Sequence, residues 1–117
     1  MREIKEYLVA QTEKAKRAGI KNIIIDPGIG FGKTVEHNLT IMKHLAEFKE
    51  LGYPLLLGTS RKGFIGTILD RDTKDRLAGT LATVAACVLN GADIIRAHDI
   101  KECGDAIKIA YAIKTSS

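Results

Sequence analysis

The feature that most restricts the fold of this chain is the alternation of short apolar runs with longer amphipathic segments. The runs are rich in Ile and Leu, and their shortness favours buried strands over helical turns. They occupy residues 22–26 ("NIIID"), 54–58 ("PLLLG") and 93–97 ("DIIRA"). The segments between and around them place apolar residues at helical spacing, and three of them stop at a glycine. Helices are therefore expected over residues 2–18, 34–51, about 74–90 and 105–114.

The predicted order of elements is α-β-α-β-α-β-α. Strands that alternate with helices are typical of βαβ units and of a parallel sheet, so the fold class is α/β. With 117 residues the chain is one domain at most. Right-handed crossovers between three strands put the helices on one face of the sheet, and the other face then needs cover from elsewhere. Taken alone, the sequence resembles a piece of a larger protein.

Composition and charge exclude several classes of partner. The net charge is only +4, aromatic residues make up 5% of the chain, and the basic residues are not interleaved with aromatics, so no nucleic acid is expected. No apolar stretch approaches the roughly 20 residues of a membrane span. The N-terminus mixes acidic and basic residues, unlike a secretory signal. Cys87 and Cys103 lack metal-binding spacing, and Cys87 fits a core position, so a cytoplasmic protein is expected.

A glycine-rich segment, "DPGIGFGKT" at residues 26–34, follows the first apolar run directly. It resembles a phosphate-binding loop, but a P-loop would need its first glycine at the position of Pro27. The dinucleotide fingerprint also fails, because the glycines are spaced G-x-G-x-G rather than G-x-G-x-x-G. Lys33 is therefore not a phosphate lysine by any motif in the chain.

Polar side chains follow each of the three predicted strands. Asp26 and the glycine loop follow the first, "GTSRKG" (residues 58–63) the second, and "RAHD" (residues 96–99) the third. Ligands of parallel α/β folds gather where the strands end at their carboxyl edge. The alignment of three such strand ends therefore favours a ligand site over three independent loops.

The charges at these strand ends indicate what binds. Lys62, Arg96 and His98 suit an anion such as phosphate or pyrophosphate. A buried Asp26 would accept hydrogen bonds from the amidine-like edge of a heterocycle, and the glycines let backbone approach a flat ring. The residues thus predict a heterocycle that carries a phosphate group. Simpler roles stay open: Asp26 as a turn former, Lys62 as a solvated loop lysine, and His98 as a cap of the last helix.

The segments "DPGIGFGKTVEHN", "GTSRKGFIG" and "RAHD" resemble the last three signature segments of the dihydropteroate synthase family, in order and with the right spacing. The resemblance covers essentially the whole chain. It implies a (β/α)8 TIM barrel of which residues 1–117 form the C-terminal portion, with strands six, seven and eight. It also implies that the family's earlier segments, including the metal-coordinating first loop, are absent here.

The resemblance implies a role for each matching residue. Asp26 would bind the amino-pyrimidine edge of the pterin, and Phe31 would lie against the p-aminobenzoate ring. Lys62 would contact the pterin and close the pocket on the p-aminobenzoate side. Arg96 would stack on the pterin and hold pyrophosphate together with His98. The implied catalytic residues are Lys62, Arg96 and His98, and the implied substrate-binding residues are Asp26, Phe31, Gly58, Lys62, Arg96, Ala97 and His98.

The implied reaction joins (7,8-dihydropterin-6-yl)methyl diphosphate to p-aminobenzoate, giving dihydropteroate for folate biosynthesis, and it is the target of sulfonamides. Pyrophosphate leaves the pterin methylene carbon and the arylamine attacks it, so the protein acts mainly through electrostatics. A Mg²⁺ ion is expected through the missing N-terminal part and the pyrophosphate, with no metal ligand in this chain. The family often has Ser after "SRK", where this sequence has Gly63, so that contact is missing or comes from backbone.

Other functions remain open at this point. One is a pterin-binding methyltransferase module of the same superfamily, which would use methyl-tetrahydrofolate. Another is a non-catalytic barrel fragment that binds only a partner chain. The complete "GTSRKGFIG" and "RAHD" pair favours the synthase. The chain alone is expected to be inactive. Its unpaired sheet edges are expected to be covered by self-association, which gives a homo-oligomer, or by the rest of a larger polypeptide.

Overall fold

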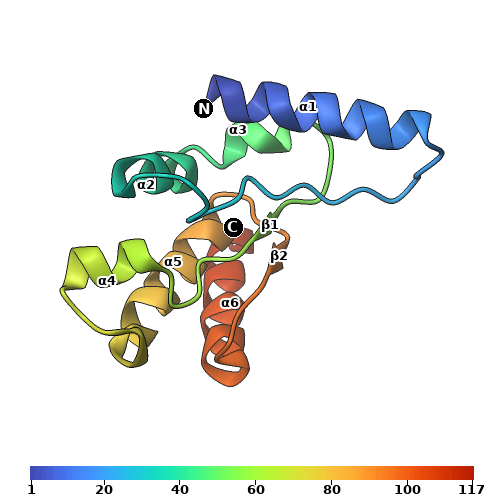
Figure 1. The fold of residues 1–117 in the computed structure, drawn as a ribbon. Helices are drawn as coiled ribbons and strands as arrows, with labels where there is room; N and C mark the ends of the chain where they lie inside the picture. The colour runs from blue at the N-terminus through green and yellow to red at the C-terminus, as the bar shows by residue number, and fades with distance from the viewer.

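A small parallel sheet lies among the helices of this protein, whose computed structural model describes residues 1–117 (Figure 1). The strands are β1 (Leu56–Leu57) and β2 (Ile94–Ile95). The helices are α1 (Arg2–Arg17), α2 (Val35–Lys43), α3 (Ala46–Lys49), α4 (Gly63–Leu69), α5 (Leu77–Leu89) and α6 (Ile100–Thr115), with a 3-10 turn, η1, at Thr73–Asp75. None of the helices combines the length and the apolar character that a membrane span requires.

The strands pair in parallel, as predicted. Leu57 of β1 pairs with Ile95 of β2, and Ile25 forms a parallel bridge with Leu55 on the other side. The three apolar runs thus lie side by side in chain order. The expected first strand at residues 22–26, however, is wrong as a strand, because it is reduced to the single bridge at Ile25.

Two prolines explain why this bridge does not grow into a strand. The amide of Ile25 donates to the carbonyl of Pro54 (2.9 Å), and the amide of Leu56 donates to the carbonyl of Ile25 (2.8 Å). Extending this parallel ladder in one direction would need an N–H at position 27, and in the other an N–H at position 54. Both positions are proline, which has no N–H to donate. The pairing between the first two apolar runs is therefore limited to the single bridge of Ile25 with Leu55.

Several helices differ in extent from the prediction. The segment expected to be one helix over residues 34–51 is divided into α2 and α3, with a break at His44–Leu45. The helix expected over about 74–90 begins only at Leu77, because residues 73–75 form the 3-10 turn. The last helix is longer than the expected 105–114, since it begins at Ile100. Apolar spacing located these helices, but backbone hydrogen bonding decided their ends.

One face of the sheet is packed and the other is not. Ile25, Leu55 and Leu57 point to the same side and are fully buried in the main apolar cluster, together with Leu45 and Phe48. Strand alternation sends Ile24 and Leu56 to the opposite side, where Ile24 is 54% exposed and Leu56 is half-buried. This chain therefore covers only one face of its sheet, which agrees with the expectation from the crossovers.

The two cysteines and one ion pair lie away from the strand ends that carry the polar motifs. Cys87 and Cys103 are free and buried, and burial raises the pKa of Cys87 to about 12, so this thiol acts as a core side chain.

At the start of β2, Asp93 accepts a hydrogen bond from the Leu55 amide (2.9 Å) and forms an ion pair with Lys49. Burial opposes ionisation of Asp93, but these hydrogen bonds outweigh it and hold its pKa below the ordinary value. This end of the sheet is fastened by structural contacts.

Candidate functional site

A cavity of about 360 Å³ lies at the carboxyl ends of the strands. All seven residues that the sequence predicted as substrate contacts line it: Asp26, Phe31, Gly58, Lys62, Arg96, Ala97 and His98. Two further residues, Leu56 and Ser60, complete the lining. The structure therefore brings together, around one space, side chains that lie on three separate loops in sequence.

Two side chains stabilise the conformation of the glycine loop by accepting hydrogen bonds from its backbone. Gly28, Gly30 and Gly32 all have φ in the left-handed region, between 62° and 87°, which glycine adopts most readily. The Oδ1 atom of Asp26 accepts from the Gly28 amide (2.8 Å), and the Oδ1 atom of Asn38 accepts from the Gly30 amide (2.8 Å). The expectation of a buried Asp26 is wrong: its residue is exposed, because the chain offers no cover on that side of the sheet. Asp26 does serve as a turn former, and its second oxygen is free for a ligand.

Asn38 is a residue whose role the sequence did not reveal. It lies in the first turn of α2, yet it is only 2% exposed and its amide oxygen supports the loop. A buried asparagine must find a hydrogen-bond partner, which here is the backbone amide of Gly30 in the glycine loop. Position in the chain gave no sign of this contact.

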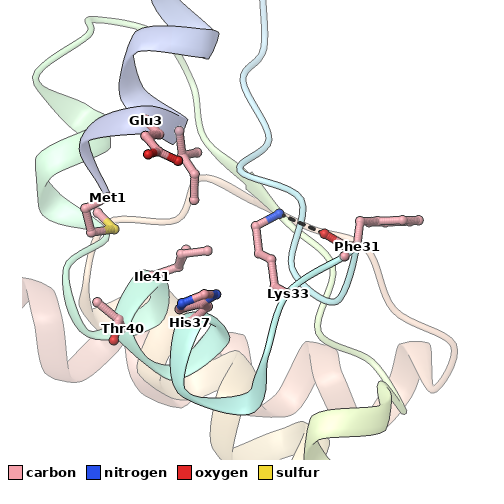
Figure 2. Close-up of a pocket in the computed structure, with 9 residues that line it drawn as sticks. Met1, Glu3, Phe31, Lys33, His37, Thr40 and Ile41 are labelled. Atoms are coloured by element: carbon pink, nitrogen blue, oxygen red, sulfur yellow. Dashed lines mark hydrogen bonds between the residues drawn. The ribbon is translucent and has the colours of Figure 1, made fainter.

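Lys33 also belongs to the loop's internal support. Its Nζ atom donates to the carbonyl of Gly28 (2.8 Å) and to that of Phe31 (3.2 Å), the second of which is drawn in Figure 2. In the same view the Phe31 ring points away from Lys33 and from His37 on α2. The ammonium group of Lys33 thus donates to two backbone carbonyls of its own loop. A second cavity of about 420 Å³, whose lining residues are drawn in Figure 2, shares Phe31 with the cavity at the strand ends.

Lys62 spans the cavity toward the glycine loop. Its Nζ atom donates to the carbonyl of Ile29 (2.5 Å) and lies 4.5 Å from the centre of the Phe31 ring. Its stem passes so close to Gly30 that a Cβ there would lie 2.8 Å from the Lys62 Cδ atom. Burial and the charges of Arg96 and Lys33 hold the pKa of Lys62 below its ordinary value, with Asp26 opposing them. A solvated loop lysine would have none of these contacts.

The last strand end presents a guanidinium and an imidazole. Arg96 follows β2, where its amide donates to the carbonyl of Leu57 (3.0 Å), while its guanidinium makes no hydrogen bond or ion pair. The imidazole of His98 lies against Ser60, with 2.7 Å between Nδ1 and the Ser60 Oγ atom. Asp99, not His98, is the N-terminal flanking residue of α6, so the structure gives His98 no capping role. Arg96 is therefore available to an incoming anion.

A strained turn fastens the loop that carries Lys62. Arg61 has φ of 55°, and its backbone is held at both ends, by the Thr80 hydroxyl on its amide (2.9 Å) and by Arg76 on its carbonyl (2.9 Å). Its guanidinium forms two hydrogen bonds with the carboxylate of Asp99 (2.8 and 3.3 Å). The Arg61 guanidinium lowers the pKa of the Asp99 carboxyl below its usual range. Arg61 thus ties the Lys62 loop to the His98 loop and is not a wall of the cavity.

The cavity is suited to an anion on one side and to hydrogen-bond donors on the other. Lys62 and Arg96 bring positive charge, and Asp26 brings a carboxylate at the opposite strand end. No group of three or more His, Cys, Asp or Glu side chains in residues 1–117 is placed to hold a metal ion.

Comparisons with known proteins point to one family. The sequence profile of the family described as "Pterin binding enzyme" matches residues 1–98. Curated dihydropteroate synthases from Synechocystis sp. and Escherichia coli are 46% and 40% identical over 114 and 112 residues, or 95% and 94% of this chain. The chain spans only 39% and 40% of the lengths of these relatives.

Solved structures give the same result. A dihydropteroate synthase from Coxiella burnetii in complex with pteroic acid superposes with a TM-score of 0.96 and 40% identity, covering 98% of this chain and 45% of that one. The Yersinia pestis enzyme in a sulfonamide drug complex gives a TM-score of 0.97 and 36% identity, covering 100% and 43%. These neighbours imply a TIM-barrel fold. By profile, sequence and structure, this chain belongs to the pterin-binding enzyme family, with dihydropteroate synthases as its similar relatives.

Proposed function

We propose that residues 1–117 form the C-terminal portion of a dihydropteroate synthase barrel, carrying its sixth, seventh and eighth strands. The observation that carries this proposal is the single cavity at the strand ends, which collects every predicted substrate contact. The relatives support it, since the region of this chain that matches them includes the residues that line the cavity. One of these relatives was solved in complex with pteroic acid. The proposed reaction joins (7,8-dihydropterin-6-yl)methyl diphosphate to p-aminobenzoate.

Each side chain has a proposed place in this reaction. The free oxygen of Asp26 binds the amino-pyrimidine edge of the pterin, and Arg96 stacks on the ring system. Phe31, which is 73% exposed and has the Lys62 ammonium over its ring, packs against the p-aminobenzoate ring. Arg96 and His98 bind the diphosphate. In this proposal the two substrates lie along the line from Asp26 to Phe31, and the anion lies at the β2 end.

The bond changes require electrostatic help rather than a protein nucleophile. The C–O bond between the pterin methylene and the diphosphate breaks, and its electron pair leaves with the pyrophosphate. The amine nitrogen of p-aminobenzoate forms a bond to that carbon and then loses a proton. Arg96 and His98 stabilise the negative charge that develops on the leaving group, while Lys62 contacts the pterin on the p-aminobenzoate side. Mg²⁺, which the residues of this chain do not hold, is expected to bind through the diphosphate and other parts of the barrel.

Gly63 marks a difference from the usual family pattern. It is the first residue of α4, and nothing lies within 4 Å of the position that a Cβ would take. A serine there would meet no obstruction. We therefore expect Gly63→Ser to be tolerated and to tighten binding of p-aminobenzoate, which would show that the contact had been missing.

A chimaera tests the proposed function. Residues 1–117 replace the matching segment of the Synechocystis relative, so that a complete barrel is formed around the cavity. The expected result is release of pyrophosphate that depends on p-aminobenzoate and is inhibited by a sulfonamide. Arg96→Gln in the same chimaera is the matched control and should abolish this release. A folded chimaera that releases no pyrophosphate, or that instead transfers a methyl group from methyl-tetrahydrofolate, would refute the proposal.

A further inference from the structure

Ser60 lines the cavity but has no role in the reaction proposed above. It lies between β1 and α4, and it is only 7% exposed. Its Oγ atom has two partners in the structure, both in His98. The His98 backbone amide donates to it at 3.1 Å, and the His98 Nδ1 atom lies 2.7 Å away. One buried hydroxyl thus serves both the backbone and the ring of the same histidine.

Counting hydrogens decides which nitrogen of His98 carries the proton. A serine hydroxyl has one hydrogen to donate and two lone pairs that accept. The His98 amide can only donate, so it takes one lone pair of the Ser60 oxygen. If Nδ1 carried a hydrogen as well, both lone pairs would be used and the hydroxyl hydrogen would have no acceptor in a buried place. If Nδ1 is bare, the Ser60 hydroxyl donates to it and every group is satisfied.

We propose that Ser60 is a positioning residue that fixes neutral His98 as the Nε2–H tautomer. Nε2 has no partner in the protein, and His98 lines the cavity beside Arg96 and Lys62. The ring then presents an N–H donor to the anion while its only basic nitrogen faces Ser60. In terms of the proposed function, on which the identity of the anion rests, His98 binds the departing diphosphate and is not the base that takes the proton from the arylamine.

The residues next to Ser60 and His98 in the sequence hold these two residues in position. The hydroxyl of the neighbouring Thr59 is hydrogen-bonded to that of Thr83 of α5 (2.8 Å), which holds one side of Ser60. On the other side, Arg61 pairs with Asp99, the residue that follows His98. Ser60 and His98 are thus both flanked by residues that are tied to fixed elements. The contact between Ser60 and His98 is therefore held by the residues next to each of them in the sequence.

Nitrogen NMR of the histidine ring tests the tautomer without any assay of activity. The full natural polypeptide that carries this sequence is labelled with ¹⁵N-histidine, and long-range ¹H–¹⁵N spectra are recorded at alkaline pH, where imidazole is neutral. His98→Asn assigns the signal. We expect the Nε2–H form to exceed the Nδ1–H form by about tenfold or more, because the latter leaves a buried hydroxyl without an acceptor. In Ser60→Ala the Nδ1–H fraction should rise several-fold, and Ser60→Thr, which keeps the hydroxyl, should restore the native ratio.

The outcomes separate this inference from the proposed function. A dominant Nδ1–H signal in the native protein, or an unchanged ratio in a folded Ser60→Ala variant, would overturn the role of Ser60. If Ser60→Ala does not fold, the native spectrum and that of Ser60→Thr still decide. Inorganic pyrophosphate is then titrated, and we expect about tenfold weaker binding by Ser60→Ala, with Ser60→Thr near native. An Nε2–H tautomer in a protein that binds no pyrophosphate would support the tautomer and contradict the proposed function.

Discussion

Replacement of Asp26 by asparagine separates the two roles that this residue has in the structure. One carboxylate oxygen accepts from the Gly28 amide and shapes the glycine loop. The other has no partner and, as proposed, binds the pterin. Asparagine keeps an acceptor for the Gly28 amide but removes the negative charge and adds an NH₂ group. The substitution therefore leaves the turn and removes the charge-assisted contact with the ligand.

The expected loss can be stated from the kind of bond that is removed. A hydrogen bond to a charged group contributes about 1.5–3 kcal/mol, which corresponds to roughly a 10- to 150-fold weaker affinity. Isothermal titration of pteroic acid into the chimaera and into its Asp26→Asn variant measures this directly. The melting temperature should change little, since Asp26 is exposed and its hydrogen bond to Gly28 is retained.

Asp26→Ala is the matched control. It removes the turn contact as well, so it should lose affinity like asparagine and should also lower stability, by up to about 1.5 kcal/mol because the contact with the Gly28 amide is exposed to solvent. If Asp26→Asn binds pteroic acid as tightly as the native protein does, Asp26 is only a turn residue. The assignment of the pterin to this strand end would then be wrong.

Four further results are expected. Lys62→Ala in the chimaera should lower turnover at least about tenfold while the protein still folds, as a thermal melt would show, because Lys62 lies in a loop and its side chain adds only a few contacts, with Ile29, Phe31 and Gly30; full activity would make Lys62 a loop residue. Gly30→Ala should cost more activity than Gly32→Ala, since both strain the backbone by about 1–2 kcal/mol but only the first meets the Lys62 side chain; equal losses would show that this contact is unimportant. Because its pKa is lowered on folding, Asp93 stabilises the protein above about pH 4, and this contribution should disappear as the pH falls through the folded-state pKa; urea unfolding of Asp93→Asn should converge on the native protein there, and a constant difference at all pH values would contradict it. Residues 1–117 expressed alone should self-associate in size exclusion with light scattering, and a sharp monomer with a cooperative melt would refute this.

Much of the site could be predicted because it depends on where strands end. Short apolar runs marked the strands, and in a parallel sheet their carboxyl ends meet at one edge. Asp26, Lys62 and Arg96 could therefore be brought together without coordinates. The depth of each side chain could not be predicted in this way. Asp26 is exposed because its burial would require a further segment to cover the other face of the sheet. A local sequence pattern does not show whether such a segment is present.

The supporting contacts were the part that sequence patterns missed. Asn38 and Ser60 are ordinary polar residues at a helix start and in a turn, and each finds its partner on a different loop. Such bonds depend on how loops meet in three dimensions, which periodicity does not describe. The early end of the first strand is different. Pro27 and Pro54 were visible in the sequence, and their missing donors act together only once the register of the pairing is known.

The parallel pairing of β1 with β2 also has a consequence for the order in which this chain folds during synthesis. All of α4 and α5 must emerge from the ribosome before Ile94–Ile95 can reach Leu56–Leu57. Helix α6, which packs on α5, follows β2 in the chain, so this packing also forms only after β2 has emerged. Until then the edge of β1 stays open on the nascent chain, where chaperones or a second chain could pair with it. Proteolysis of ribosome-stalled chains should find this edge cleavable until β2 has emerged, and early protection would show that another segment covers it first.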